Sequence, residues 1–143
     1  MDDFRNKAMA AYIECNHESN APFCHFGIHR NSNNELIGYL DFQDITEERA
    51  ELSLSIPDKN YRNKHYGIDA VMVALKYAFE TRNIPNIIVR TSVDNIVVKN
   101  ICEKIGLKYE EEHFTGNGRD HDLLRYEINN HIYKEILSKL FGG

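Results

Sequence analysis

Three short stretches in the first half of the chain are rich in apolar residues and predict strands: residues 23–29, 36–42 and 50–56. In the third stretch, every second residue from Ala50 to Ile56 is apolar and polar residues lie between them. This period of two is typical of a strand with one buried face. Turn-forming residues separate the stretches, so we expect three strands that form an antiparallel meander.

Apolar residues recur at helical spacing in four other stretches: residues 4–15, 67–81, 97–105 and 132–141. A β-branched apolar run at residues 87–93 predicts a buried strand. Residues 108–114 and 123–128 flank a Gly-Asn-Gly sequence and predict a hairpin. The predicted order is helix, three strands, helix, strand, helix, two strands and helix, which indicates an α/β fold with a mixed sheet.

Composition narrows the class of protein. The 143 residues suit one domain, and we expect residues 1–143 to form it. The net charge of -5 argues against nucleic acid as a partner. Three cysteines make no disulfide framework, and the chain has no apolar run of the ~20 residues that a membrane span needs. The acidic N-terminus does not resemble a signal peptide, so we expect a cytoplasmic protein without membrane contact.

Residues 61–70 form a basic stretch between a predicted strand and a predicted helix. Backbone N–H groups converge at such a junction, and the helix dipole favours an anion there. Arg62 and Lys64 add positive charge, and Gly67 would let the backbone approach a ligand closely. The sequence therefore indicates a phosphate-binding loop. A solvated loop that merely connects two elements is the alternative.

This stretch resembles the acetyl-CoA pyrophosphate loop of the GNAT superfamily, Q/R-x-x-G-x-G/A. Arg62 fills its first position and Gly67 its last, whereas His65 stands in place of the first glycine. If that position has a positive φ, the histidine is sterically strained. The resemblance implies that acetyl-CoA is the cofactor. It assigns the following residues to the binding loop: Arg62, Asn63, Lys64, His65, Tyr66, Gly67 and Ile68.

Residues 95–107 resemble a second GNAT segment, N-x-x-S-x-x-x-x-E-K-x-G-F. Asn95, Glu103, Lys104 and Gly106 match it, and Val98 replaces the usual small polar residue. The resemblance implies that the side-chain amide of Asn95 holds the pantetheine arm. A helix N-cap is the alternative role for Asn95, and both roles are compatible.

In order and spacing, residues 24–129 resemble the branch with ribosomal-protein and spermidine N-acetyltransferases. The resemblance implies a mixed, mostly antiparallel twisted sheet flanked by helices, with an extra C-terminal helix. It also implies direct transfer of an acetyl group from acetyl-CoA to a primary amine, which belongs to a small molecule, a polyamine or a protein N-terminus. The alternative is a GNAT-fold module of weak or no activity that binds acyl-CoA or a protein partner.

Typical members of this family have another strand and one or two helices before the strand at residue 23. Only about twenty residues precede it here, so we expect the first strand and part of the acceptor-side wall to be missing. A second copy of the chain in a homodimer could complete the site.

Acetyl transfer needs a group that stabilises the carbonyl oxygen, a base for the amine and an acid for the thiolate. The resemblance places the first in the backbone N–H groups of Leu54, Ser55 and Ile56. It makes Glu51 the base, with an exposed structural carboxylate as the alternative. Related enzymes often have a tyrosine acid where this chain has Cys102.

Cys102 lies on an apolar stripe, so a small buried hydrophobe is the alternative to an acid at this position. Tyr109 and Tyr66 are possible substitutes for the acid. The seven histidines show no ligand spacing with a third partner outside the His121 region, which a polar turn explains. We therefore expect no metal site.

Overall fold

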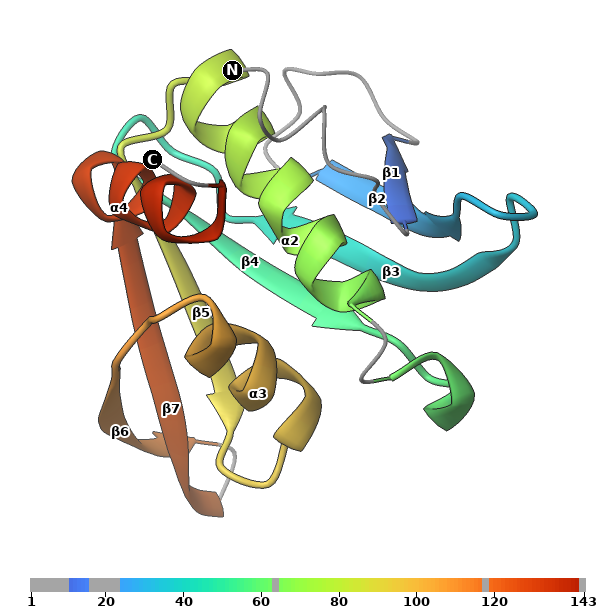
Figure 1. The fold of residues 1–143 in the computed structure, drawn as a ribbon. Helices are drawn as coiled ribbons and strands as arrows, with labels where there is room; N and C mark the ends of the chain where they lie inside the picture. The colour runs from blue at the N-terminus through green and yellow to red at the C-terminus, as the bar shows by residue number, and fades with distance from the viewer. Residues whose placement is uncertain (1–10, 16–23, 63–64, 117–118, 142–143) are drawn as a thin grey trace.

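The computed structural model describes residues 11–15, 24–62, 65–116 and 119–141. Within these ranges, seven strands form one sheet in the order β1-β2-β3-β4-β5-β7-β6 (Figure 1). The strands are β1 (Ala11–Cys15), β2 (Cys24–Arg30), β3 (Leu36–Gln43), β4 (Ala50–Ser55), β5 (Asn86–Ser92), β6 (Tyr109–Gly116) and β7 (Arg119–Asn129).

All neighbouring strands are antiparallel except β4 and β5, which run parallel. This parallel pair has only two residue pairs, Ala50 with Ile87 and Glu51 with Ile88. Both strands continue for another four residues, to Ser55 and Ser92, without pairing to each other. The sheet therefore opens between β4 and β5 beyond Glu51.

The helical elements lie between and after these strands. They are η1 (Lys59–Tyr61), α2 (Tyr66–Lys76), the π-helical turn η2 (Tyr77–Thr81), α3 (Ile96–Lys104) and α4 (Asn130–Phe141). Figure 1 shows α2, α3 and α4 on the same side of the sheet, with α2 crossing β3 and β4. Apolar side chains fill the layer between, including Leu52, Val89 and Tyr126 from the strands and Val71 and Ile101 from the helices.

The opposite face of the sheet carries mainly polar side chains, including Asp41, Glu51, Arg90 and Arg125. These residues alternate along the strands with buried ones such as Phe42, Leu52, Val89 and Leu124. In the described ranges, no helix covers this face. We call it the open face.

The predicted α/β fold with a mixed, mostly antiparallel sheet and an added C-terminal helix is confirmed. Two expectations about the N-terminal region are wrong. Residues 11–15 were predicted to be helical but form β1, and a strand therefore does precede β2. In five residues, apolar Ala11 and Ile13 fit a period of two as well as a helical stripe, and pairing with β2 decides between them. Residues 4–10 lie outside the described ranges.

None of the helices in the described ranges is long and apolar enough to cross a lipid bilayer. The assignment of residues 1–143 to one domain stays a prediction.

Candidate active site

A pocket of about 90 Å³ lies where β4 and β5 diverge. We call it the inter-strand pocket. Its walls come from β4, β5, β7, α2, α3 and the segments that flank α3, and most of them are apolar. The lining residues are Leu52, Ser53, Leu54, Val71, Val89, Arg90, Thr91, Asn95, Val98, Ile101, Cys102, Ile105, Leu107 and Ile128.

A second pocket of about 340 Å³ lies at the N-terminus of α2. We call it the loop pocket. Three cationic side chains line it: Lys59, Arg62 and Lys104. Ile101 lines both pockets, so they adjoin at α3. Together they combine a basic end with an apolar end at the gap in the sheet.

Among the described residues, no side chain caps the N-terminus of α2. The first backbone N–H groups of a helix lack an intrahelical partner, and those of α2 are free to meet a ligand in the loop pocket. The helix dipole and the three cations favour an anion at this position. The site therefore suits the phosphate groups of a ligand, such as the pyrophosphate of acetyl-CoA.

His65 precedes α2 with φ 67° and ψ 2°, in the left-handed region. The residue that replaces the first glycine of the family loop thus has the positive φ that glycine accommodates without strain. Its side chain is exposed and lines the loop pocket with that of Ile68. Asn63 and Lys64, which the sequence assigned to the same loop, lie outside the described residues.

Arg62 lines the loop pocket, but part of its guanidinium is already engaged. Its Nε donates to the carbonyl of Ile56 at 3.0 Å, and its Nη2 donates to the carbonyl of Pro57 at 3.3 Å. These bonds tie the loop to the end of β4. The side chains of Lys59 and Lys104 also line the pocket, make no hydrogen bond or ion pair within the described ranges, and are not among the ligands that the sequence predicts. Lys104 could have been found, because it belongs to the matched segment of α3.

Gly67 lines the loop pocket and also has a packing role that the sequence does not predict. A Cβ at this position would lie 2.5 Å from Cδ1 of Ile101, so the glycine lets α2 pack closely against α3. Tyr66 is not among the residues that line the loop pocket. Its ring lies 6.1 Å from that of Tyr61 and 5.6 Å from the guanidinium carbon of Arg30. Tyr66 can therefore offer the pocket its backbone N–H rather than its side chain.

The end of β4 has one free edge. Leu54 pairs with Leu40, and Ser55 pairs with Tyr39, both on the β3 side. Toward β5 the backbone groups of these residues have no strand partner. Such an edge can bond an extended ligand as a strand would. Ile56 follows β4 and lines the loop pocket.

Asn95 caps α3: its Oδ1 accepts from the N–H of Val98 at 3.3 Å. The residue also lines the inter-strand pocket. The N-cap alternative therefore holds, and contact with a pantetheine arm stays a prediction that this position permits.

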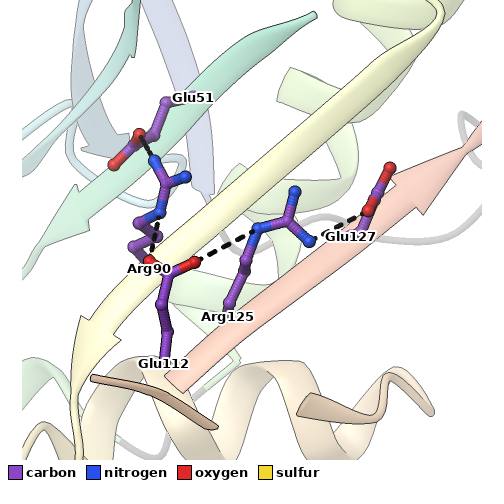
Figure 2. Close-up of polar contacts among 5 residues, drawn as sticks. All are labelled: Glu51, Arg90, Glu112, Arg125 and Glu127. Atoms are coloured by element: carbon purple, nitrogen blue, oxygen red, sulfur yellow. Dashed lines mark hydrogen bonds and ion pairs between the residues drawn. The ribbon is translucent and has the colours of Figure 1, made fainter. Parts of the chain in front are cut away.

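Glu51 lies on the open face at the last position where β4 pairs with β5, in an ion pair with Arg90. The distance from Arg90 Nη1 to Glu51 Oε1 is 2.7 Å. Figure 2 shows Arg90 between Glu51 and Glu112, and Arg125 beyond them. The predicted base is thus a carboxylate with a cationic partner. Arg90 was not selected from the sequence, although it is the only charged residue of β5.

Cys102 lines the inter-strand pocket, where its side chain is buried. Burial raises the pKa of the thiol to about 12. An acid that holds its proton this firmly is poorly matched to a thiolate whose conjugate acid titrates near ~8.5. The position favours the alternative of a small buried hydrophobe. Tyr109, by contrast, is 42% exposed on β6.

In the described part of the chain, no three His, Cys, Asp or Glu side chains form a group that could hold a metal ion.

The GNAT acetyltransferase domain family matches residues 2–108 of this chain. The chain belongs to the GNAT acetyltransferase family. The class predicted from the sequence, an acyl-CoA-dependent N-acetyltransferase, is the class that this family defines. Among curated proteins, none matches the chain.

Solved structures with this fold include mutant forms of a spermidine/spermine N-acetyltransferase from Vibrio cholerae. The TM-score is 0.67 at 24% identity, over 82% of this chain and 72% of that chain. A GNAT-family acetyltransferase from Bacillus anthracis gives a TM-score of 0.65 at 25% identity, over 75% of this chain and 66% of that chain. The predicted resemblance to the spermidine branch thus agrees with the structural neighbours at the level of the fold.

Proposed function

We propose that this protein transfers an acetyl group from acetyl-CoA to a primary amine by direct transfer. The observation that carries the proposal is the opening between β4 and β5 beside the uncapped, basic N-terminus of α2. Family membership supports the same reaction.

The cofactor supplies its acetyl group as a thioester. The N–H groups of residues 65–68, with Lys59, Arg62 and Lys104, hold its phosphates in the loop pocket. Asn63 and Lys64 are proposed as further phosphate ligands from the sequence pattern alone. The free edge of β4 binds the pantetheine arm, and Asn95 faces the same pocket. The backbone N–H groups of residues 54–56 stabilise the carbonyl oxygen.

On the open face, Glu51 accepts a proton from the attacking amine. The amine nitrogen then bonds to the carbonyl carbon as the carbon–sulfur bond breaks, and the thiolate takes a proton. Cys102 is a weak candidate for that acid because of its raised pKa. Tyr109 and Tyr66 remain the substitutes, although the side chain of neither lines the inter-strand pocket.

We place cationic amines first among the acceptors, and polyamines first among these. Asp41, Glu51, Glu112 and Glu127 belong to the polar side of the sheet, and carboxylates favour ammonium groups. The spermidine N-acetyltransferases with this fold support the same class. A protein N-terminus also suits a face that no described helix covers.

An inactive or weakly active module is the second candidate, favoured by the strained His65 and by Val98 in place of a small polar residue.

Calorimetric titration with acetyl-CoA and with free CoA tests the cofactor site, and an amine screen that follows release of the CoA thiol tests turnover. We expect micromolar binding that weakens in a Lys59→Gln, Lys104→Gln double variant. Lys76→Gln is the matched control, because Lys76 lies at the other end of α2 in an ion pair with Glu80. No binding at millimolar cofactor would contradict the proposal and favour the module.

A further inference from the structure

Arg90 lies where the two halves of the sheet separate. The last pair between β4 and β5 is Glu51 with Ile88. Arg90 lies two residues beyond Ile88 on β5, and Ser53 lies two residues beyond Glu51 on β4. Arg90 and Ser53 both line the inter-strand pocket. The guanidinium reaches back from this pocket to the Glu51 carboxylate. Arg90 is therefore a cation in direct contact with the proposed base at the edge of the gap.

We propose that Arg90 competes with the ammonium group of the acceptor for the Glu51 carboxylate. This competition determines which amines bind. The inference rests on the proposed function, since it concerns the acceptor of that same site. An acceptor whose ammonium group binds Glu51 must displace Arg90 from that carboxylate. Acceptors with further positive charges then gain more from the carboxylates of the open face than monocations do.

The contacts of Arg90 make this exchange feasible. Its Nη1 donates to Glu51 at 2.7 Å, while its Nε donates to Glu112 on β6 at 3.0 Å. Glu51 and Arg90 are about 30% and 31% exposed at their side chains, so water and solutes reach the pair. When Arg90 leaves Glu51, the Glu112 carboxylate still neutralises it. Neither charge has to be left unpaired during exchange.

The charges of the group leave room for one more cation. Glu112 also lies 3.8 Å from Arg125, and Arg125 contacts Glu127 at 3.0 Å (Figure 2). In the group that Figure 2 draws, three carboxylates thus face two guanidinium groups. An ammonium group at Glu51 would balance the set, whereas an anion or a neutral group would not.

The competing explanation is structural: Arg90 holds β4 to β5 where their pairing ends. Both explanations predict a loss of stability when Arg90 is replaced. They differ in what they predict for amine binding. If Arg90 competes with the amine, an uncharged residue at position 90 increases the affinity for amines. If Arg90 only holds the strands together, the affinity does not increase.

The test is calorimetric titration of the full chain with spermidine and with n-butylamine, in the absence of acetyl-CoA. In Arg90→Met we expect spermidine to bind about tenfold more tightly than in the native protein, and n-butylamine by a smaller factor. Arg125→Met is the matched control: it removes the same charge from the same group without touching Glu51, and we expect a change of less than about threefold. In Arg90→Met combined with Glu51→Gln the gain should disappear.

Equal effects of the two arginine variants, weaker binding in Arg90→Met, or no amine binding in any variant would each overturn the inference. Thermal denaturation reports whether each variant folds, and Arg90→Gln serves as the uncharged variant if Arg90→Met does not. Acetyl-CoA titration of the same samples separates the two proposals. Loss of cofactor binding contradicts the proposed function, whereas normal cofactor binding with unchanged amine affinity contradicts only the role of Arg90.

Discussion

His65 is the position at which this loop departs from the glycine pattern of its family. The family pattern has glycine here, and the structure shows why: φ is 67° at the N-cap of α2. A left-handed backbone strains a residue with a Cβ, although histidine tolerates it better than a β-branched residue does. The exposed imidazole lies at the mouth of the loop pocket, where it can contact an anion.

We expect His65→Gly to stabilise the fold by about 1 kcal/mol, because glycine adopts this φ without strain. Acetyl-CoA affinity should be retained or increased, and turnover likewise. Chemical denaturation and calorimetric titration measure the two effects. Asn83→Gly is the control, because Asn83 has a φ of 54° and lines neither the loop pocket nor the inter-strand pocket. A large loss of cofactor affinity in His65→Gly would show that the imidazole itself binds phosphate.

Cys102 offers a second comparison at the scale of one side chain. Because its thiol is buried and its pKa is raised to about 12, we expect Cys102→Ala to leave the pH profile of kcat/KM unchanged. Loss of the alkaline limb of that profile would restore Cys102 as the acid.

Stability should respond to pH in one direction. A raised pKa means that the folded state favours the protonated thiol. The resulting stabilisation is fully present below the ordinary thiol pKa and is lost as the pH rises toward 12. We expect Cys102→Ala to cost about 1 kcal/mol near neutral pH, with a difference that narrows above pH ~9. Denaturation series at pH 7 and pH 10 measure it.

At the scale of elements, the close packing of α2 on α3 shapes both pockets, since Ile101 lines each of them. Gly67 makes this packing possible, because a Cβ there would lie 2.5 Å from Cδ1 of Ile101. The glycine that the family pattern associates with phosphate thus also sets the distance between two helices.

We expect Gly67→Ala to destabilise the protein by about 1 kcal/mol, as overpacking outweighs the better helix propensity of alanine. Ile101→Val removes the clashing methyl group, so the double variant should be more stable than the sum of the single effects predicts, by about 1 kcal/mol. Denaturant unfolding of the four proteins gives the coupling. Additive effects would mean that the helices separate freely.

Sequence patterns predicted the elements with long, regular periods and missed features that depend on distant partners. The alternation in β4 and the helical stripe of α2 were sufficient to place both. Residues 11–15 were too few to distinguish a strand from a helix without β2. The Glu51–Arg90 pair depends on strand register, and the cations of the loop pocket come from η1 and α3 as well as from the predicted loop.

At the scale of the molecule, the sheet consists of two parts, β1–β4 and β5–β7, that meet in two residue pairs. Helices α2 and α3 pack over the boundary on one side, and the Glu51–Arg90 pair crosses it on the open face. A ligand bound in the gap would contact both parts at once. Binding should therefore stabilise the whole fold and not only the loop, by an amount that grows with ligand concentration.

The unpaired edge of β4 also has a kinetic consequence. Amide protons that point into the gap lack a strand acceptor, so in the ligand-free protein they should exchange with deuterated water faster than those of β3. We expect acetyl-CoA to slow exchange in peptides that cover residues 52–56 and 86–92, with little change in those that cover residues 36–43. Protection confined to residues 58–70 would contradict this expectation. Deuterium uptake along β4 would thus report, minute by minute, whether the gap in the sheet is filled.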